Sequence, residues 1–226
     1  MSSCGEAQPD PRAAPLPAAH YADSLAAVEL RRAHLWKRYQ QSTDEERRAV
    51  LADAQNLMRR SVVGSVIPFW FGTSWDFNGT SETPGHGAIA CGYFVTTVLR
   101  DSGFRIERAG LAQLPSETMI RSLVDAPHIR RYSDAPIDCF VASVREWGTG
   151  LYLVGLDCHT GFIVCEEGDV AFLHSAFAEP FSVVCEDAEE SLILAASRYR
   201  VLGKLTADPE LARRWLAGER TGARKA

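Results

Sequence analysis

One cysteine and two histidines in this sequence have the types and the order of a nucleophilic catalytic site. A cysteine attacks a carbonyl carbon as its thiolate, and a neighbouring histidine can take the thiol proton. A third polar side chain then holds that histidine in the correct orientation. Cys91, His159 and His174 could fill these roles, with Cys91 as nucleophile, His159 as its base and His174 orienting the base. The chemistry expected of such a set is acyl transfer through a thioester.

Cys91 lies where the sequence predicts the start of a helix that ends near Asp101-Ser102-Gly103. A helix N-terminus next to an imidazolium lowers the pKa of a thiol, and the backbone N–H of such a cysteine could bind an oxyanion. The segment before Cys91, Pro84-Gly85-His86-Gly87 followed by Ala88-Ile89-Ala90, is rich in glycine and alanine. These small residues leave room for a substrate backbone next to the sulfur. Taken alone, however, Cys91 would more readily be a buried cysteine at a helix–sheet contact.

The two histidines lie on a predicted β-hairpin. His159–Cys165 and Val170–Ser175 are β-rich runs, and Glu167-Gly168-Asp169 between them predicts a tight turn. His174 follows His159 by 15 residues, so folding of this hairpin brings the two side chains together on adjacent strands. A single histidine in a strand is usually only accommodated by the fold. Two on one hairpin, downstream of a helix-start cysteine, favour a catalytic interpretation.

With these elements in place, the sequence resembles the NlpC-type cell-wall peptidases of the papain-like clan. That family has an aromatic-glycine loop, a cysteine that opens a helix, a strand beginning His-x-Gly, and a polar residue on the next strand. The corresponding segments are Phe69–Gly72, Cys91–Val95, His159–Val164 and Phe172–Ser175, and the resemblance covers roughly residues 65–205. It implies a papain-like α+β fold, with N-terminal helices packed on a mostly antiparallel sheet, and cysteine peptidase or amidase activity.

The sequence departs from the family around the nucleophile. The family usually has Asp before the cysteine and Ser after it, whereas Ala90 and Gly92 stand here, and the tyrosine expected in the aromatic loop is missing. We therefore expect weak cleavage of an ordinary stem peptide and better cleavage of a larger or more apolar acyl substrate. The predicted substrate-binding residues are Trp70, Trp75, Phe77 and His86, although the aromatic side chains could be core lids and His86 could simply face solvent.

The remaining pattern predicts helices first and strands later, which is typical of the α+β class. A disordered tether is expected over residues 1–20, a helical segment packed on the domain over 21–64, and the hydrolase domain over 65–226. A capping box at Thr43–Glu46 should begin the second helix. Further helices are expected at 23–41, 116–124, 189–196 and 209–216, and further strands at Phe140–Val144, Leu151–Leu156, Phe181–Cys185 and Tyr199–Leu205.

Charge and cysteine usage limit the partners. A net charge of -5 and a pI near 5.7 provide no basic surface, so nucleic acid is not an expected partner. The cysteine and histidine spacings fit no standard metal set, although Cys158, His159, Cys165 and His174 could in principle gather around a metal; Cys139, Cys158, Cys165 and Cys185 are more simply buried small residues. The N-terminus allows two predictions of localisation. Ser2-Ser3-Cys4 before a Pro/Ala-rich stretch resembles the end of a bacterial lipoprotein signal, with Cys4 as lipid anchor. The protein is then expected in the cell envelope if a signal was removed before Cys4, and in the cytoplasm otherwise.

The function predicted from these observations is hydrolysis of an amide bond through a thioester acyl-enzyme, in a bacterial cell-wall peptide or another small amide-containing substrate. No cofactor or metal is required for this chemistry. Two alternatives remain open on the sequence: an acyltransferase that uses the same cysteine and histidine, and a catalytically inert binding domain of the same fold.

Overall fold

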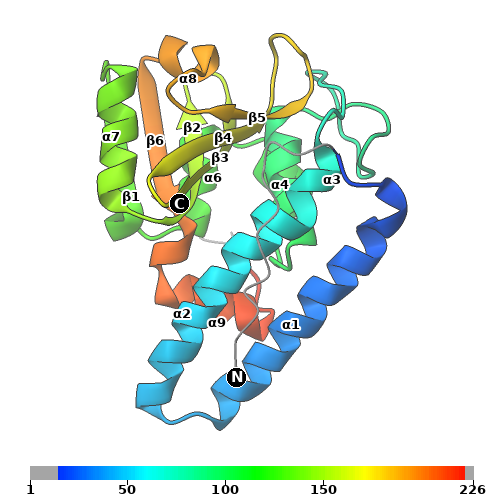
Figure 1. Ribbon diagram of the computed structural model, residues 1–226, viewed down its shortest axis with the longest axis vertical. Coiled ribbons are helices and arrows are strands. Elements are labelled where there is room, and N and C mark those ends of the chain that lie inside the picture. The colour runs from blue at the N-terminus through cyan, green and yellow to red at the C-terminus, as the bar shows by residue number, and fades with distance from the viewer. Residues whose placement is uncertain (1–14, 222–226) are drawn as a thin grey trace.

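The computed structural model describes residues 15–221, which form one antiparallel sheet with helices on both faces (Figure 1). The predicted α+β class is confirmed. The tether predicted over residues 1–20 falls largely outside the described residues, as does Cys4. From Leu16, whose amide donates to the Pro68 carbonyl at 3.1 Å, the chain lies against the fold.

The described helices lie mainly in the first half of the chain. In chain order they are α1 (Tyr21–Gln41), α2 (Asp44–Arg60), α3 (Ile67–Trp70), α4 (Cys91–Asp101), α5 (Arg108–Ala112), α6 (Ser116–Leu123), α7 (Ile137–Trp147), α8 (Leu192–Ala196) and α9 (Pro209–Ala217), with a π-helical turn at Ser61–Val66 and 3₁₀ turns at Ala18–His20, Ala126–His128 and Leu205–Ala207.

Six described strands form a single sheet in the order β1-β6-β2-β3-β4-β5, and every neighbouring pair is antiparallel. The strands are β1 (Ile129–Ser133), β2 (Gly150–Leu156), β3 (Thr160–Glu166), β4 (Asp169–Ser175), β5 (Val183–Asp187) and β6 (Tyr199–Lys204). The sheet centre, β2 and β3, is apolar on both faces, because helices cover both sides.

The long N-terminal hairpin of α1 and α2 is part of the main fold rather than a separate unit (Figure 1). The predicted capping box begins α2: the Thr43 amide donates to Glu46 Oε2 at 2.8 Å and the Glu46 amide donates to Thr43 Oγ1 at 3.4 Å. Arg32 of α1 donates to the last carbonyls of α9, at Trp215 and Leu216. The two Arg32 hydrogen bonds hold the hairpin against α9.

The segment after α2 remains helical as far as Trp70, whereas the sequence predicts an aromatic loop from Phe69. Pro68 has no N–H and so cannot continue regular α-helical hydrogen bonding, and a π-helical turn directly precedes its helix α3. Trp70 ends this helix with its side chain fully buried and its Nε1–H donating to the Tyr21 hydroxyl at 3.0 Å. The aromatic loop therefore begins only at Phe71.

Opposite faces of the sheet carry different helices. Core residues of α2, α4, α6 and α9 pack with Phe162 and Leu173 on one face, where the Phe94 ring of α4 meets the Phe162 ring edge-on at 6.1 Å. Core residues of α7 and α8 pack with Ile163 and Phe172 on the other. The sheet therefore separates two apolar cores, and α4 lies on only one of its faces.

One predicted strand is wrong. Phe140–Val144 lies inside helix α7, where Phe140, Val141 and Val144 form the buried stripe that faces the sheet. Those positions are also spaced as one face of a helix, and a short apolar run does not distinguish the two structures. Strand β1 and helix α5 had no predicted counterpart, and the remaining predicted elements are present with small shifts of their ends.

The β3–β4 hairpin that carries the histidines is present as predicted. Its turn residues Glu167 and Gly168 have φ values of 52° and 93°, the left-handed pair that a two-residue hairpin turn needs. The resulting register pairs Phe162 with Leu173. Among residues 15–221, the helices lack the combination of length and hydropathy required to cross a bilayer.

Candidate active site

Cys91 is the first residue of α4, as predicted, and close backbone packing holds it there. The preceding Ala90 amide donates to the Gly79 carbonyl at 2.9 Å, which ties the aromatic loop to the helix start. A Cβ at Gly92 would collide with the Ala112 carbonyl oxygen of α5. Glycine at position 92 is therefore needed for the packing of α4 against α5, and a serine side chain would not fit there.

His159 directly precedes β3 and is almost fully buried, with 3% of its surface exposed. Its Nε2 lies 2.8 Å from Nδ1 of His174, so the hairpin brings these two predicted residues into hydrogen-bond contact. The other ring nitrogen, Nδ1, has no hydrogen-bond partner among the described residues. One nitrogen of the His159 ring is thus held by His174, and the other is buried without a hydrogen-bond partner.

His174 makes a further contact that the sequence analysis did not predict. Its Nε2 lies 3.3 Å from Glu186 Oε2 on β5, within ion-pair range but without the alignment of a hydrogen bond. The Phe172 ring stacks on the His174 ring with centroids 3.9 Å apart and planes at 10°. The predicted strand ended at Cys185, one residue short of this carboxylate.

Gly161 explains how the histidine pair fits between strands. A Cβ at this position would come within 2.8 Å of both His174 Cβ and the Leu173 carbonyl oxygen. Any larger residue would therefore displace β4 or the His174 ring. The His-x-Gly pattern at His159 thus has a steric cause in this fold.

The contacts define one consistent placement of the ring protons. If Glu186 is ionised, His174 carries its proton on Nε2, facing the carboxylate. His174 Nδ1 is then an acceptor, so His159 must donate from its Nε2. His159 Nδ1 is left with a free lone pair, which is the form a general base requires.

Cys91 and His159 line the same cavity, which we call the Cys91 cavity and which has a volume of about 730 Å³. Trp75 and Phe77 of the aromatic loop lie on its wall, as predicted for substrate-binding residues. A second hollow of about 310 Å³, lined by Pro115, Glu117 and Met119, also contains both Cys91 and His159. The side chains and backbone lining the Cys91 cavity belong to Trp75, Phe77, Asn78, Thr80, Ala90, Cys91, Gly92, Tyr93, Ala112, Gln113, Cys158, His159 and Phe177.

Two predicted substrate-binding residues lie elsewhere. Trp70 is fully buried in the core against Tyr21, because α3 extends further than expected. His86 is exposed in the loop, where its carbonyl accepts a hydrogen bond from Ser81 Oγ at 2.6 Å, and it lines neither hollow at Cys91. Tyr93, Gln113 and Phe177 line the cavity instead. They come from separate segments of the chain, and no sequence signal indicated that folding would bring them together.

Burial leaves both partners neutral rather than charged. Desolvation raises the pKa of the Cys91 thiol, and nearby backbone N–H groups of Thr160 and Gly92 only partly oppose it. Desolvation, followed by the neighbouring His174, lowers the pKa of His159 to about 3. The pKa of His174 is also lowered by burial, against the pull of Glu186. The thiol pKa depression expected from a helix start and an imidazolium is therefore absent from the unliganded site.

By residue type, the described cysteines and histidines are also candidate ligands of a metal ion. Among the described residues, Cys91, Cys139, Cys158, Cys165 and Cys185 form no disulfide bond. Among residues 15–221, no three His, Cys, Asp or Glu side chains converge as a metal-binding group. Of the thiols other than Cys91, Cys158 alone lines the Cys91 cavity, and its side chain is exposed.

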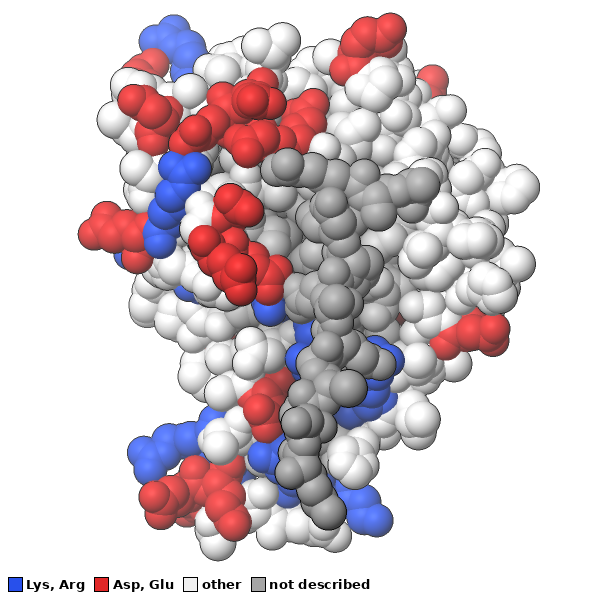
Figure 2. Space-filling view, in the orientation of Figure 1, with Lys and Arg blue, Asp and Glu red and all other residues white. Residues whose placement is uncertain are grey.

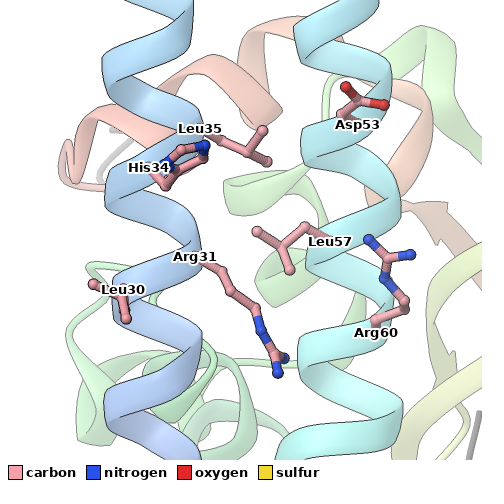
Figure 3. A pocket seen from close by; sticks show the side chains of 7 residues that line it. All are labelled: Leu30, Arg31, His34, Leu35, Asp53, Leu57 and Arg60. Carbon is pink, nitrogen blue, oxygen red and sulfur yellow. The ribbon is translucent and has the colours of Figure 1, made fainter. Parts of the chain in front are cut away.

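A third hollow lies between α1 and α2 (Figure 3). It has a volume of about 620 Å³ and contains no thiol. Its lining residues are Leu30, Arg31, His34, Leu35, Asp53, Leu57 and Arg60, none of which lines the Cys91 cavity. On the face shown in Figure 2, Lys and Arg side chains lie among Asp and Glu and form no continuous basic surface.

Comparison with protein-family models, with curated proteins and with solved structures finds no match to this chain.

Proposed function

We propose that this protein is a papain-like cysteine hydrolase that cleaves an acyl bond through a thioester intermediate on Cys91. The observation that carries the proposal is that Cys91 and His159 line one cavity, and that His159 has one nitrogen held by His174 and the other without a hydrogen-bond partner. A nucleophile, a base and a group that orients the base are the parts that acyl transfer needs.

In the proposed reaction, His159 Nδ1 accepts the Cys91 proton as sulfur attacks the substrate carbonyl carbon. The first turn of a helix has N–H groups without intrahelical acceptors, and in this mechanism the Cys91 N–H donates to the developing oxyanion. The carbon–heteroatom bond then breaks, and the leaving group takes the proton from His159. Water, deprotonated by the same nitrogen, attacks the thioester and releases the carboxylic acid and the free thiol.

His174 and Glu186 act on His159 rather than on substrate. Proton uptake at Nδ1 makes His159 a cation, which a hydrogen bond to neutral His174 stabilises. Glu186 in turn favours the His174 tautomer that accepts this bond. Both are positioning residues, and the buried stack of His174 on Phe172 keeps the arrangement rigid.

The lining of the cavity favours an apolar acyl group. Trp75, Phe77, Tyr93 and Phe177 contribute aromatic surface, and none of the described residues lining either hollow at Cys91 is Lys or Arg. Glu117, the acidic residue of the smaller hollow, is already paired with Arg131 at 2.7 Å. A carboxylate-rich stem peptide would find no cationic partner there, so we propose a less charged amide, ester or thioester as substrate.

Trapping of the acyl-enzyme tests the proposal. Purified protein is mixed with amide, ester and thioester probes, and intact-mass spectrometry after acid quench should show one acyl group attached at Cys91. Cys91→Ala should abolish the adduct. Cys158→Ala is the matched control, because Cys158 is the exposed thiol in the same cavity. Equal labelling of Cys91 and Cys158, or turnover that survives Cys91→Ala, would favour an inert binding domain.

Acyl transfer to an amine or alcohol would use the same site and the same intermediate. Adding a primary amine or an alcohol during turnover distinguishes the two reactions. For a hydrolase, the released product remains the free acid, and its rate of formation is unchanged.

A further inference from the structure

A separate pocket adjoins His159 but not Cys91. We call it the His159 pocket; it has a volume of about 280 Å³. Its apolar wall comes from the end of β2, the loop after β4, and helix α8. The residues of that wall are Leu156, Phe177, Ala178, Leu192, Ile193 and Ala196.

Phe177 separates this pocket from the Cys91 cavity. It lines both, as do His159 and Cys158. The Phe177 ring packs edge-on against the His159 ring at 5.1 Å between centroids, and on the cavity side it lies 6.3 Å from the Trp75 ring. His159 is thus at the junction of two spaces, and Cys91 belongs to only one of them.

Apart from His159 and Cys158, the polar side chains of the His159 pocket are Asp157 and Ser197, and both form hydrogen bonds within the fold. The Asp157 carboxylate accepts hydrogen bonds from the Arg198 amide at 2.7 Å and the Tyr199 amide at 3.2 Å, and also from Ser197 Oγ at 3.2 Å. Ser197 Oγ is bonded to the Tyr199 carbonyl as well, at 2.8 Å. No described residue lining the pocket is Lys or Arg. An anionic group would therefore lose its hydration there without gaining a cationic partner, whereas an apolar group would meet a mostly apolar wall.

The chemistry of acyl transfer assigns different roles to the two spaces. The acyl carbon bonds to sulfur, so the acyl group lies where Cys91 is accessible. The leaving heteroatom must take its proton from His159, so the departing group lies where His159 is accessible. A pocket that contains the base and excludes the nucleophile fits the second requirement.

We propose that the His159 pocket binds the leaving group of the substrate and selects an apolar one, an aliphatic or aryl amine, alcohol or thiol. This inference rests on the proposed function, and it names the part of the substrate on the far side of the cleaved bond. The small volume favours a single ring or a short chain, since drug-sized ligands occupy pockets of about 300–1,000 Å³.

The test compares two thioesters with the same acyl group and different leaving thiols. Hexanoyl thioesters of benzyl mercaptan and of 2-mercaptoethanesulfonate differ in the polarity of the leaving group. We expect kcat/KM for the benzyl thioester to be about 10-fold higher or more, as burial of a ring-sized apolar group allows. Spontaneous hydrolysis of each thioester provides the correction for intrinsic reactivity.

Ala196→Trp should fill the pocket and remove most of this preference, while turnover of the sulfonate thioester continues. Ala195→Trp is the matched control, because Ala195 is the preceding exposed residue of α8 and does not line the pocket. Leu192→Asp is the second variant: Leu192 is 83% exposed, so its replacement leaves folding intact while making the pocket polar.

The outcomes separate the two proposals. Cys91-dependent turnover with no preference for the benzyl group, or a preference unchanged by Ala196→Trp and Leu192→Asp, would overturn the pocket assignment and leave the hydrolase in place. Absence of any Cys91-dependent turnover or acyl-enzyme with both thioesters would overturn the proposed function and the pocket assignment together.

Discussion

Cys91 and His159 line one cavity, but Cys91 and the His159–His174 pair have contrasting surroundings. Cys91 is partly exposed, at the end of a helix on one face, and its immediate neighbours are small residues and backbone. His174 is fully buried, stacked on Phe172, whose side chain belongs to the core of the opposite face. Under the proposed mechanism, the nucleophile Cys91 is therefore accessible, whereas His174, which orients the base, is held rigidly.

The contrast has an electrostatic consequence. Burial raises the pKa of the Cys91 thiol and lowers the pKa of His159, so both shifts favour the neutral pair. A thiolate–imidazolium pair would need polar stabilisation that the unliganded cavity does not supply. The proton should thus move when a substrate carbonyl is in place, as in general-base catalysis.

The largest effect should come from removing the base. His159→Ala should lower kcat/KM on the best probe by about 10²–10⁴-fold, the usual contribution of a general acid–base residue. His86→Ala, in the exposed loop, is the matched histidine control. Circular dichroism verifies that both variants fold. Near-normal turnover by His159→Ala would remove His159 from the site.

The second prediction distinguishes a neutral Cys91–His159 pair from a thiolate–imidazolium pair by the pH dependence of Cys91 alkylation. If Cys91 rests as a thiol, its alkylation by iodoacetamide should accelerate about 10-fold per pH unit between pH 6 and 8, as the thiolate fraction grows. Peptide mass spectrometry measures the rate, with exposed Cys139 as the internal reference. A Cys91 rate that stays level from pH 5 to 8 would instead demonstrate a preformed thiolate–imidazolium pair.

A smaller effect is expected from the residues behind the base. His174→Ala should lower kcat/KM by about 10-fold, because a buried hydrogen bond contributes about 1–1.5 kcal/mol. Glu186→Gln should cost less, since its distance to His174 is longer and Glu186 is half-buried. Both variants should still form the acyl-enzyme, more slowly. Unchanged turnover after His174→Ala would show that His159 is oriented by its own burial alone.

The last prediction concerns stability rather than rate. The folded-state pKa of His159 lies near 3, below its unfolded value of 6.5, so below pH 6.5 the unfolded chain binds a proton that the native chain does not. The free energy of unfolding should therefore fall as pH drops from 7 to 5, by about 1.4 kcal/mol per unit below pH 6.5 for each such histidine. The lowered pKa of Glu186 contributes only below about pH 4.5.

Urea unfolding at pH 7 and pH 5 measures this loss in wild-type protein and in His159→Gln. The variant should lose less stability than wild type over this interval, because the contribution of His159 is removed while that of His174, whose pKa burial also lowers, remains. His86→Gln should behave as wild type. An equal loss in His159→Gln would mean that other groups cause the acid sensitivity.

Sequence patterns predicted the helices most reliably where a local signal marked their ends. The capping box at Thr43 and the small residues before Cys91 each identify a helix start with few alternatives. The run at Phe140 carried no such signal. Its apolar side chains fit either a strand or a helix face, and packing against the sheet decided for the helix.

The sequence by itself determined the order of Cys91, His159 and His174 and the hairpin that joins the two histidines, because turn residues and alternating β-rich runs act locally. Only the tertiary structure decided that Glu186 lies behind His174, since β5 pairs with β4 across the hairpin's outer edge. It also placed Trp70 in the core and Phe177 at the cavity, and it reversed the expected shift of the thiol pKa. The physical reason is that burial and desolvation arise from segments distant in sequence, which a local pattern does not contain.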